Sequence, residues 1–230
     1  TFPNVYVDLT GRDIALPNIA IMDAKATGKL VNLGNSPSQL QLNATGINIS
    51  NQPIRALQID FSGTQADHRL DVKADSVKGQ IQASLKGAIN LNTKQWTGVL
   101  GNGQVGTKYA QLQQLQPAQM VMNWQNPRVE LAAHCWQMVG QTGRLCLKEN
   151  LVTAKAEGHI DASLQQIDSQ IFSVFLPKDI AWKGELNGNA LVHWKQGQHP
   201  NINASFYSDN GVLGLAADIP EDPPMTLTYD

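Results

Sequence analysis

Residues 81–91 read IQASLKGAINL, with Ile81, Ala83, Leu85, Ile89 and Leu91 on one parity and mostly polar side chains between them. Successive side chains of a β-strand point to opposite faces of the sheet, so this alternation predicts a strand with one apolar and one polar face. Strands of parallel sheets are usually apolar on both faces, and the pattern therefore favours antiparallel pairing.

Two further segments repeat this pattern, at 152–164 and 180–194. A run of 13 residues is long against the roughly 5 to 6 residues of a common strand, so we expect unusually long strands. Glycines interrupt these runs, and we interpret them as bends or bulges at which a long strand curves. These positions are Gly87, Gly158, Gly184 and Gly188.

Shorter alternating segments separated by turn signals fill the rest of the chain, and no composition shift divides it. We therefore predict an all-β fold, an elongated, curved antiparallel sheet that forms one continuous body over 1–230. One short helix is expected near 168–176, with Asp168 as its cap and Pro177 after its end. Residues 108–116 are assigned to a strand, with a short helix as the alternative.

The composition excludes several classes of partner. The 230 residues are 42% hydrophobic and only 16% charged, with a net charge of −2. This balance lacks the basic surface typical of nucleic-acid binding, so no nucleic-acid partner is expected. No apolar run approaches the ~18 residues of a membrane-spanning helix. Because the chain opens on Thr1, we expect it to be a fragment of a longer protein.

The sequence contains no recognisable catalytic or cofactor site. Residues 101–106 match G-x-G-x-x-G, but alternating strands flank them and no secure helix follows, so a glycine-rich hairpin loop is the better interpretation. The five histidines are scattered and lack metal-ligand spacing. We therefore expect a protein that is not an enzyme and that has no cofactor and no metal ion.

Cys135 and Cys146 are the two cysteines, and the turn 140–143 lies between them. A hairpin would place the two sulfur atoms opposite each other, which favours a disulfide over two reduced thiols. Closing a loop of this size stabilises a fold by about 3 kcal/mol. A disulfide in turn implies an oxidising compartment.

The apolar face of the sheet allows two architectures. It could close against a second sheet in a sandwich, or it could line an open groove. The many Ala and Gly residues at inward positions favour a curved sheet that is open to an apolar ligand. From the pattern alone the closed sandwich is the favoured architecture, and the open groove is the alternative.

The segments 132–136 (AAHCW) and 143–147 (GRLCL) resemble the TamB family, which is the inner-membrane subunit of the bacterial translocation and assembly module. The similarity extends over roughly 55–215, including QWTG at 95–98 and GELNG at 184–188. The resemblance implies a U-shaped "β-taco" in the periplasm, with an inner-membrane anchor outside this chain. It also implies phospholipid transport between the inner and outer membranes, and outer-membrane protein assembly with TamA.

The resemblance and the alternation together suggest an apolar groove whose partners are phospholipid acyl chains. TamA would bind through regions outside this chain. The alternative function is a scaffold or chaperone that pairs its strands with outer-membrane β-barrel or autotransporter clients. The residues expected to line the groove are Ile81, Ala83, Leu85, Ile89, Leu91, Val152, Ala154, Ala156, Ile160, Ala162, Leu164, Ile180, Trp182, Leu186, Ala190, Val192 and Trp194.

Overall fold

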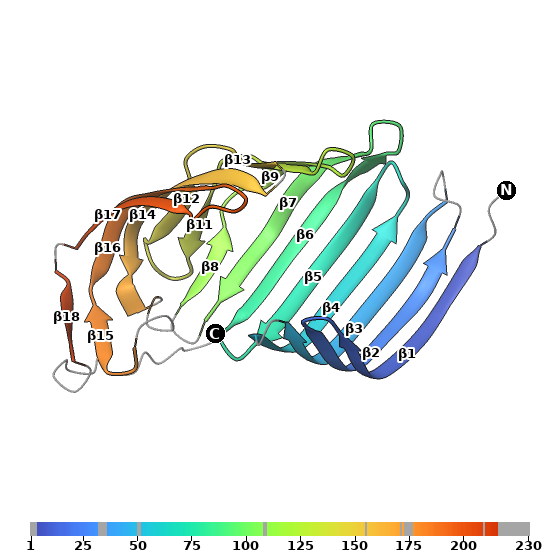
Figure 1. Ribbon diagram of the computed structural model, residues 1–230, viewed down its shortest axis with the longest axis horizontal. Coiled ribbons are helices and arrows are strands. Elements are labelled where there is room, and N and C mark those ends of the chain that lie inside the picture. Colours follow the sequence, from blue (N-terminus) through green and yellow to red (C-terminus); the bar gives the residue numbers. More distant parts are fainter. Residues whose placement is uncertain are drawn as a thin grey trace.

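A computed structural model shows one large, curved antiparallel sheet of 16 strands and a small sheet of two strands (Figure 1). The all-β prediction is confirmed. The structure describes residues 4–31, 36–49, 52–107, 110–154, 156–170, 172, 177–208 and 210–215.

The first seven strands form a regular meander in which each strand pairs with the one before it. Most of them have 11 or 12 residues, as predicted for 81–91, whereas shorter strands were expected in the rest of this region. They are β1 (Val5–Leu16), β2 (Ile19–Leu30), β3 (Ser38–Ile49), β4 (Gln52–Gly63), β5 (His68–Ser76), β6 (Gln80–Asn90) and β7 (Gln95–Gly106).

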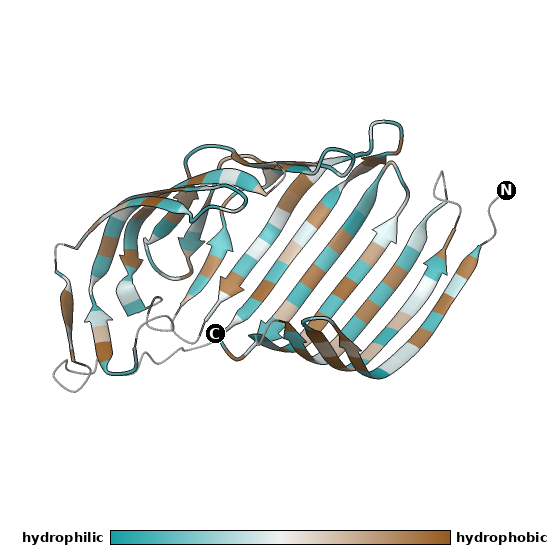
Figure 2. Ribbon diagram, in the orientation of Figure 1, coloured by the Kyte–Doolittle hydropathy of each residue, from teal (hydrophilic) through white to brown (hydrophobic). Residues whose placement is uncertain are grey.

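The register of this meander aligns the apolar residues into rows across the sheet. Leu40, Phe61, Leu70, Leu85 and Leu100 are successive partners on β3 to β7. Directly opposed residues in antiparallel strands lie on the same face, so each row is a continuous apolar ladder. Brown and teal bands alternate along the strands in Figure 2 for this reason.

Beyond β7 the meander continues, but three of its strands are broken in the middle. The halves are β8 (Gln111–Gln114) with β9 (Ala118–Asn123), β10 (Arg128–Leu131) with β11 (His134–Met138), and β12 (Arg144–Leu147) with β13 (Leu151–Ala154). β7 and β14 (Glu157–Asp168) flank them, and each pairs with both halves of its neighbouring strand. The breaks therefore form a crease that runs across the sheet.

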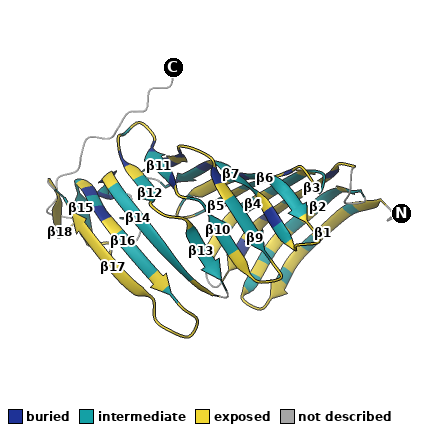
Figure 3. Ribbon diagram, turned by 90° about the horizontal axis from the view of Figure 1, so that it is seen from above, coloured by how far each residue is buried: buried dark blue, intermediate teal, exposed yellow. Residues whose placement is uncertain are grey.

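The last strands complete the large sheet and form the small one. β16 (Glu185–Trp194) pairs with β14 and with β17 (Asn201–Tyr207). β15 (Ile180–Lys183) pairs instead with β18 (Val212–Leu215). Seen from above, β1 and β17 lie at the two ends of the large sheet (Figure 3).

A second irregularity curves the first strands. Asp13 in β1 has a φ of 51° and Gly46 in β3 has a φ of 60°, both in the left-handed region. A Cβ atom on Gly46 would lie 2.7 Å from the Cβ of Met22, so glycine also allows a close approach here. The lower ends of β1 to β4 curl away from the plane of the sheet near this level (Figure 1).

Two predicted strands and the predicted helix need correction. Residues 152–164 form a hairpin of β13 and β14, with Ala156 at a φ of 66° in the turn. Residues 180–194 are β15 and β16, separated at Gly184. In place of the helix near 168–176, Asp168 ends β14 and residues 169, 170 and 172 form a 3₁₀ turn; residues 171 and 173–176 lie outside the described part. The strand assignment of 108–116 is confirmed for 111–114.

The glycines within the strands have a different role from the one expected. Only Gly184, with a φ of 119°, lies at a break between strands. Gly87 and Gly158 are paired within regular ladders, and Gly188 is paired with Leu164 directly beside the β-bulge between Leu164 and Ile167. An aromatic ring on the neighbouring strand covers each of the three glycines. Trp96 covers Gly87, Trp194 covers Gly158, and Phe206 covers Gly188.

Gly98 and Gly101 on β7 test this role. A Cβ atom on Gly98 would overlap the Lys86 carbonyl oxygen and the Trp96 ring. A Cβ atom on Gly101 would have the Cβ of Pro117 as its nearest neighbour, 3.9 Å away. We expect Gly98→Ala to lower the free energy of unfolding by about 1–3 kcal/mol. Gly101→Ala should leave it unchanged or raise it by a few tenths, since alanine restricts the unfolded chain. Urea titration measures both, and equal effects would contradict the close approach at Gly98.

Candidate functional site: the apolar face

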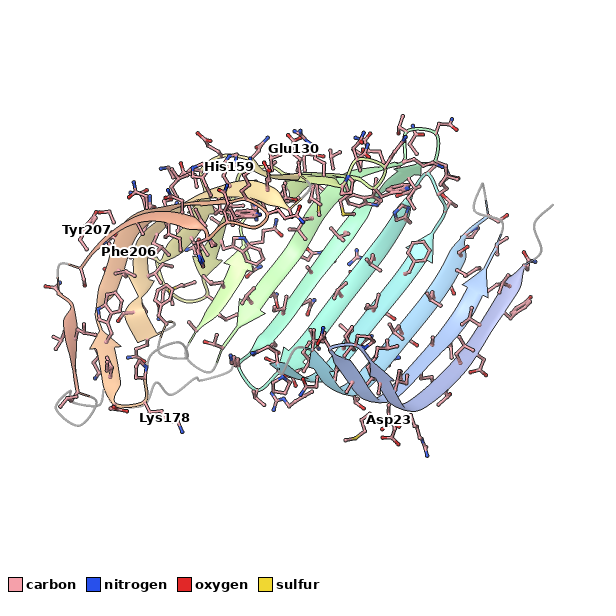
Figure 4. All side chains as sticks on the ribbon, in the orientation of Figure 1. Asp23, Glu130, His159, Lys178, Phe206 and Tyr207 are labelled. Atoms are coloured by element: carbon pink, nitrogen blue, oxygen red, sulfur yellow. A yellow bond between two sulfur atoms is a disulfide. The ribbon has the colours of Figure 1, made fainter. Side chains whose placement is uncertain are left out.

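The apolar face of the large sheet is the candidate site, because most of it remains uncovered. Among the described residues eight apolar ones are buried, whereas nineteen large apolar ones are exposed. Several of the nineteen lie in turns or on the small sheet, but the central ladder residues Leu42, Ile59 and Leu85 are also only half-buried. A second sheet packed on this face would bury them, so the sandwich does not fit. Figure 4 shows the side chains on the visible face of β1 to β7 with no strand crossing in front of their middle part.

The ladders of this face run through the whole meander. Leu9, Ala26, Leu42, Ile59 and Val72 are successive partners on β1 to β5, and Ala83 continues their row on β6. Leu9 at the edge is 65% exposed. Exposed apolar surface of this extent is characteristic of a binding surface for another apolar molecule.

A small core closes the face at one place beyond β7. Leu112, Met138 and Ile167 are buried together, and Trp136, Leu145 and Phe172 are among the residues that pack against them. This cluster joins β8 and β11 to the end of β14. It stabilises the sheet near the crease while the face of β1 to β6 remains open.

An aromatic group on β4, β5 and β7 lies within the apolar face. Trp96 Nε1 donates a hydrogen bond to His68 Nε2 at 2.7 Å, and both residues are only 6% exposed. An indole N–H can only donate, so His68 Nε2 accepts and Nδ1 carries the proton, which it donates to the Thr64 carbonyl at 3.0 Å. The Phe61 ring lies 5.5 Å from the His68 ring. All polar atoms of the His68–Trp96 pair are thus satisfied.

Beside Trp96 the face contains a hollow of about 580 Å³. Its floor follows one row of strand partners, Ile89, Trp96, Met122, Val129 and Thr153. The complete lining is Ile89, Trp96, Met122, Asn123, Trp124, Pro127, Arg128, Val129, Thr153 and Ala156. A volume of this size lies within the ~300–1,000 Å³ of small-molecule sites.

The opposite face is polar and carries a hydrogen-bonded group on β5 and β6. Arg69 donates two hydrogen bonds to the carboxylate of Asp71, and the Ser84 hydroxyl donates a third at 2.5 Å. The Arg69 hydrogen bonds lower the pKa of Asp71, although partial desolvation opposes them. The pKa of Arg69 is raised in return.

This group predicts a dependence of stability on pH. The lowered pKa of folded Asp71 stabilises the fold above its unfolded pKa of about 3.9, and this contribution is lost as the pH falls through the folded pKa. We expect Asp71→Asn to lower the free energy of unfolding at pH 7, measured by urea titration, by less than about 1 kcal/mol, since the pair is half exposed. The difference from the unsubstituted protein should shrink at pH 3, and a constant difference would contradict the assignment.

The structure contains the disulfide between Cys135 and Cys146, which are direct partners on β11 and β12. Their neighbours Trp136 and Leu145 point to the apolar face. The disulfide therefore lies on the polar face, where Cys146 is opposite Ser163 of β14. The disulfide thus links β11 to β12 without contributing a side chain to the apolar face.

The structure brings most of the predicted lining residues onto one face. Ile81, Ala83, Leu85 and Ile89 belong to the ladders of β6. On β14 and β16, the pairs Ile160–Val192 and Ala162–Ala190 share a face with Leu164, Leu186 and Trp194, which are opposite Gly188, Ile167 and Gly158. Leu186 is 3% exposed and is packed rather than open.

Six predicted lining residues lie elsewhere. Val152 and Ala154 are partners of His159 and Glu157, so they lie on the polar face. Ala156 lies in the turn, although it borders the hollow. Ile180 and Trp182 belong to the small sheet with β18. Leu91, at 45% exposure, follows the end of β6.

Sequence reasoning missed the residues of β3 to β5 and the His68–Trp96 pair as parts of this face. The alternation of Leu40, Leu42 and Ala44 was an available signal, but the pairing of His68 with Trp96 depends on register. In the described part of the chain, no three His, Cys, Asp or Glu side chains lie close enough together to bind a metal ion. No helix among these residues is long and apolar enough to cross a membrane.

Comparison with known proteins shows the family of the chain. The family model described as TamB, N-terminal domain, matches residues 1–230. The chain belongs to the TamB family. It is also similar to the translocation and assembly module subunit TamB of Haemophilus influenzae, with 22% identity over 195 residues that cover 84% of this chain. This TamB-family chain spans about 15% of the length of that relative, and no solved structure matches it.

Proposed function

We propose that this TamB-family chain forms part of a hydrophobic groove that carries phospholipids between the inner and outer membranes of a bacterium. The chain would lie in the periplasm, within a longer protein anchored in the inner membrane, and would support outer-membrane biogenesis together with TamA. No catalysis is needed for this role. The observation that carries the proposal is the uncovered apolar ladder that continues from strand to strand.

The dimensions and energetics of the face suit an acyl chain. A strand of 12 residues is about 40 Å long, which exceeds the ~30 Å hydrocarbon thickness of a bilayer. Each buried methylene contributes about 0.8 kcal/mol, so an apolar wall offsets the cost of moving a lipid tail through water. Backbone polar groups are used in the strand ladders, which leaves apolar side chains as the contact surface.

The similarity of the apolar side chains along each ladder also suits the movement of a lipid tail across the strands. Neighbouring strands are about 4.8 Å apart, and nearly every strand presents a leucine, isoleucine, valine or alanine to the same row, with Phe61 as the larger exception. A lipid tail that moves from one strand to the next exchanges one apolar contact for another of similar free energy. Such a surface has no deep minimum along these rows, so it favours sliding.

Two further observations support the cellular setting. The disulfide is expected to persist in an oxidising compartment such as the periplasm. The Haemophilus influenzae relative is named as a subunit of a translocation and assembly module, which suggests assembly with other proteins.

Site-specific photo-crosslinking in living cells tests the groove. Neighbouring residues on the two faces provide matched pairs, Leu42 with Asn43, Ile59 with Gln58, and Leu85 with Lys86. We expect probes at the three apolar positions to capture phospholipid at least tenfold more often than their polar neighbours. Equal labelling of both faces would overturn the proposal.

A scaffold or chaperone function is the second candidate, because the large sheet has two edges to which strands could add. Every residue of β17 is exposed, and within the described residues no strand pairs with the outer edge of β1. Unpaired edges bind extended peptides through backbone hydrogen bonds. Probes along β1 and β17 would then capture client proteins, whereas probes at Leu42 and Leu85 would capture neither client nor lipid.

A further inference from the structure

We propose that His159 and His193 form a site for one divalent late transition-metal ion on the polar face of the large sheet, with one imidazole nitrogen of each residue as a ligand. The two histidines are far apart in the sequence, but they are direct partners on β14 and β16. The site goes beyond the proposed groove function and does not depend on it.

Both side chains lie on the polar face. Ile160 and Val192 are neighbours of the two histidines along the strands, and they are partners on the apolar face. Successive side chains of a strand point to opposite faces, so His159 and His193 point away from the apolar ladders. His159 is half-buried and His193 is exposed, which leaves the pair accessible to a hydrated ion.

The spacing of the two rings suits one shared ion. Their centroids are 5.7 Å apart. A metal ion lies about 2.0–2.1 Å from the imidazole nitrogen that binds it, and therefore about 3 Å from the ring centroid, so two rings that share an ion have centroids about 5–6 Å apart. The ring planes differ by only 28°, and a rotation about the side-chain bonds is needed to direct both nitrogen atoms at the ion. The backbone need not move.

Nothing in the described part of the chain holds either imidazole in its present orientation by a hydrogen bond. His68 and His134 differ in this respect, because each is buried and uses its Nδ1 on a backbone carbonyl group, that of Thr64 and that of Ala132. Among the described histidines, therefore, only His159 and His193 present accessible ring nitrogens side by side.

The donor set determines the class of metal. Neutral imidazole is a good ligand for Zn²⁺, Ni²⁺ and Cu²⁺, whereas Mg²⁺ and Ca²⁺ prefer oxygen ligands. Among the divalent first-row metals the affinity of such a site is highest for Cu²⁺. Two protein ligands are fewer than the four of a structural zinc site, so water completes the coordination and the ion remains exchangeable.

The charges around the pair are balanced. Glu157 and Asp161 flank His159 at alternate positions of β14, so they lie on the same face. Each carboxylate is in an ion pair, Glu157 with Lys195 at 3.5 Å and Asp161 with Lys148 at 3.2 Å. A dication that approaches the two imidazoles therefore meets no excess of positive charge.

A bound ion would link β14 to β16 near one end of the large sheet. β17 depends on this link, because β16 is its one partner among the described strands. An ion that binds only the paired arrangement stabilises it by mass action, so the metal would strengthen this end of the sheet.

Titration of the purified protein with Cu²⁺, followed by electron paramagnetic resonance, tests the pair because the spectrum reports the coordinated imidazoles. We expect one ion bound by two imidazoles. His159→Asn and His193→Asn should each weaken binding about tenfold or more, because the loss of either ligand converts a chelate into a single contact. The double variant should lose little beyond either single one. His199→Asn, an exposed histidine outside the strands, is the matched control and should bind as wild type does.

Urea titration with Zn²⁺ gives an independent readout. The wild-type midpoint should rise with the Zn²⁺ concentration, because the two ligands are held together only in the folded sheet. The rise should be absent in His159→Asn and in His193→Asn, and Mg²⁺ at the same concentration should produce none in any of the proteins.

Equal Cu²⁺ affinity in wild type and in the two single variants would overturn the proposal, and so would a spectrum with a single coordinated imidazole. An equal rise of the midpoint with Mg²⁺ would show a general effect of ions and would overturn it as well. None of these results bears on the groove, which photo-crosslinking at Leu42, Ile59 and Leu85 tests separately.

Discussion

Leu85→Glu is expected to lower phospholipid labelling by probes at Leu70 and Leu100 roughly a hundredfold. Leu85 lies between these two residues in the central ladder, so its carboxylate would stand in the path of every acyl chain on that row. A charged side chain in a hydrocarbon environment costs about 2.5–3.5 kcal/mol. The measurement is photo-crosslinking from both neighbouring positions, normalised to the amount of protein.

The matched control is Gln82→Glu, which adds the same charge to the polar face of the same strand. It should leave labelling unchanged, and Leu85→Gln should give an intermediate loss because it adds polarity without charge. The urea midpoint of each variant separates loss of lipid from loss of fold. Full labelling in a folded Leu85→Glu protein would show that lipids do not use this ladder.

The second large effect concerns the disulfide. Reduction, or the substitution of both Cys135 and Cys146 by serine, is expected to lower the free energy of unfolding by about 3 kcal/mol, because the bond closes a loop between residues 11 positions apart. β11 and β12 have only five and four residues, so this hairpin has few other contacts that hold it. Urea titration with and without a reducing agent measures the change.

The wild-type protein under reducing conditions should match the double serine variant, and the reducing agent should have no effect on that variant. Because the bond lies on the polar face, lipid labelling at Leu85 should persist wherever the protein remains folded. An unchanged midpoint on reduction would show that the hairpin is held by its other contacts.

The alternation in β6 predicted both the strand and its apolar face, because a period of two is a local property of the chain. The same reasoning failed at 152–164, where apolar residues continue at even positions through a turn. A tight turn between Ala154 and Glu157 makes these two residues partners, so the next even position, Gly158, lies on the other face. A long strand and a hairpin thus have the same period, and only the pairing partner distinguishes them.

The candidate site was predictable as an apolar face but not as a set of contacts. Trp96 and His68 are 28 residues apart, and their hydrogen bond depends on the register of three successive strands. We expected the glycines within strands to mark bends, because an isolated glycine in a strand commonly does so. Coverage of Gly87 by Trp96 is a cross-strand relation that no local pattern expresses. The hollow beside Trp96 had no sequence signal for the same reason.

The meander topology also determines how the protein can fold. From β1 to β7 every ladder joins strands that are consecutive in the chain, so no strand waits for a distant partner. Local pairing of this kind closes short loops and lowers the entropic barrier to folding. Each finished strand exposes an edge on which the next can assemble, and the sheet can grow from its N-terminal end. If the two halves of each broken strand between β8 and β13 are counted as one strand, the first pairing that skips a strand is β16 on β14. The order of synthesis can therefore guide assembly almost to the end of the described chain.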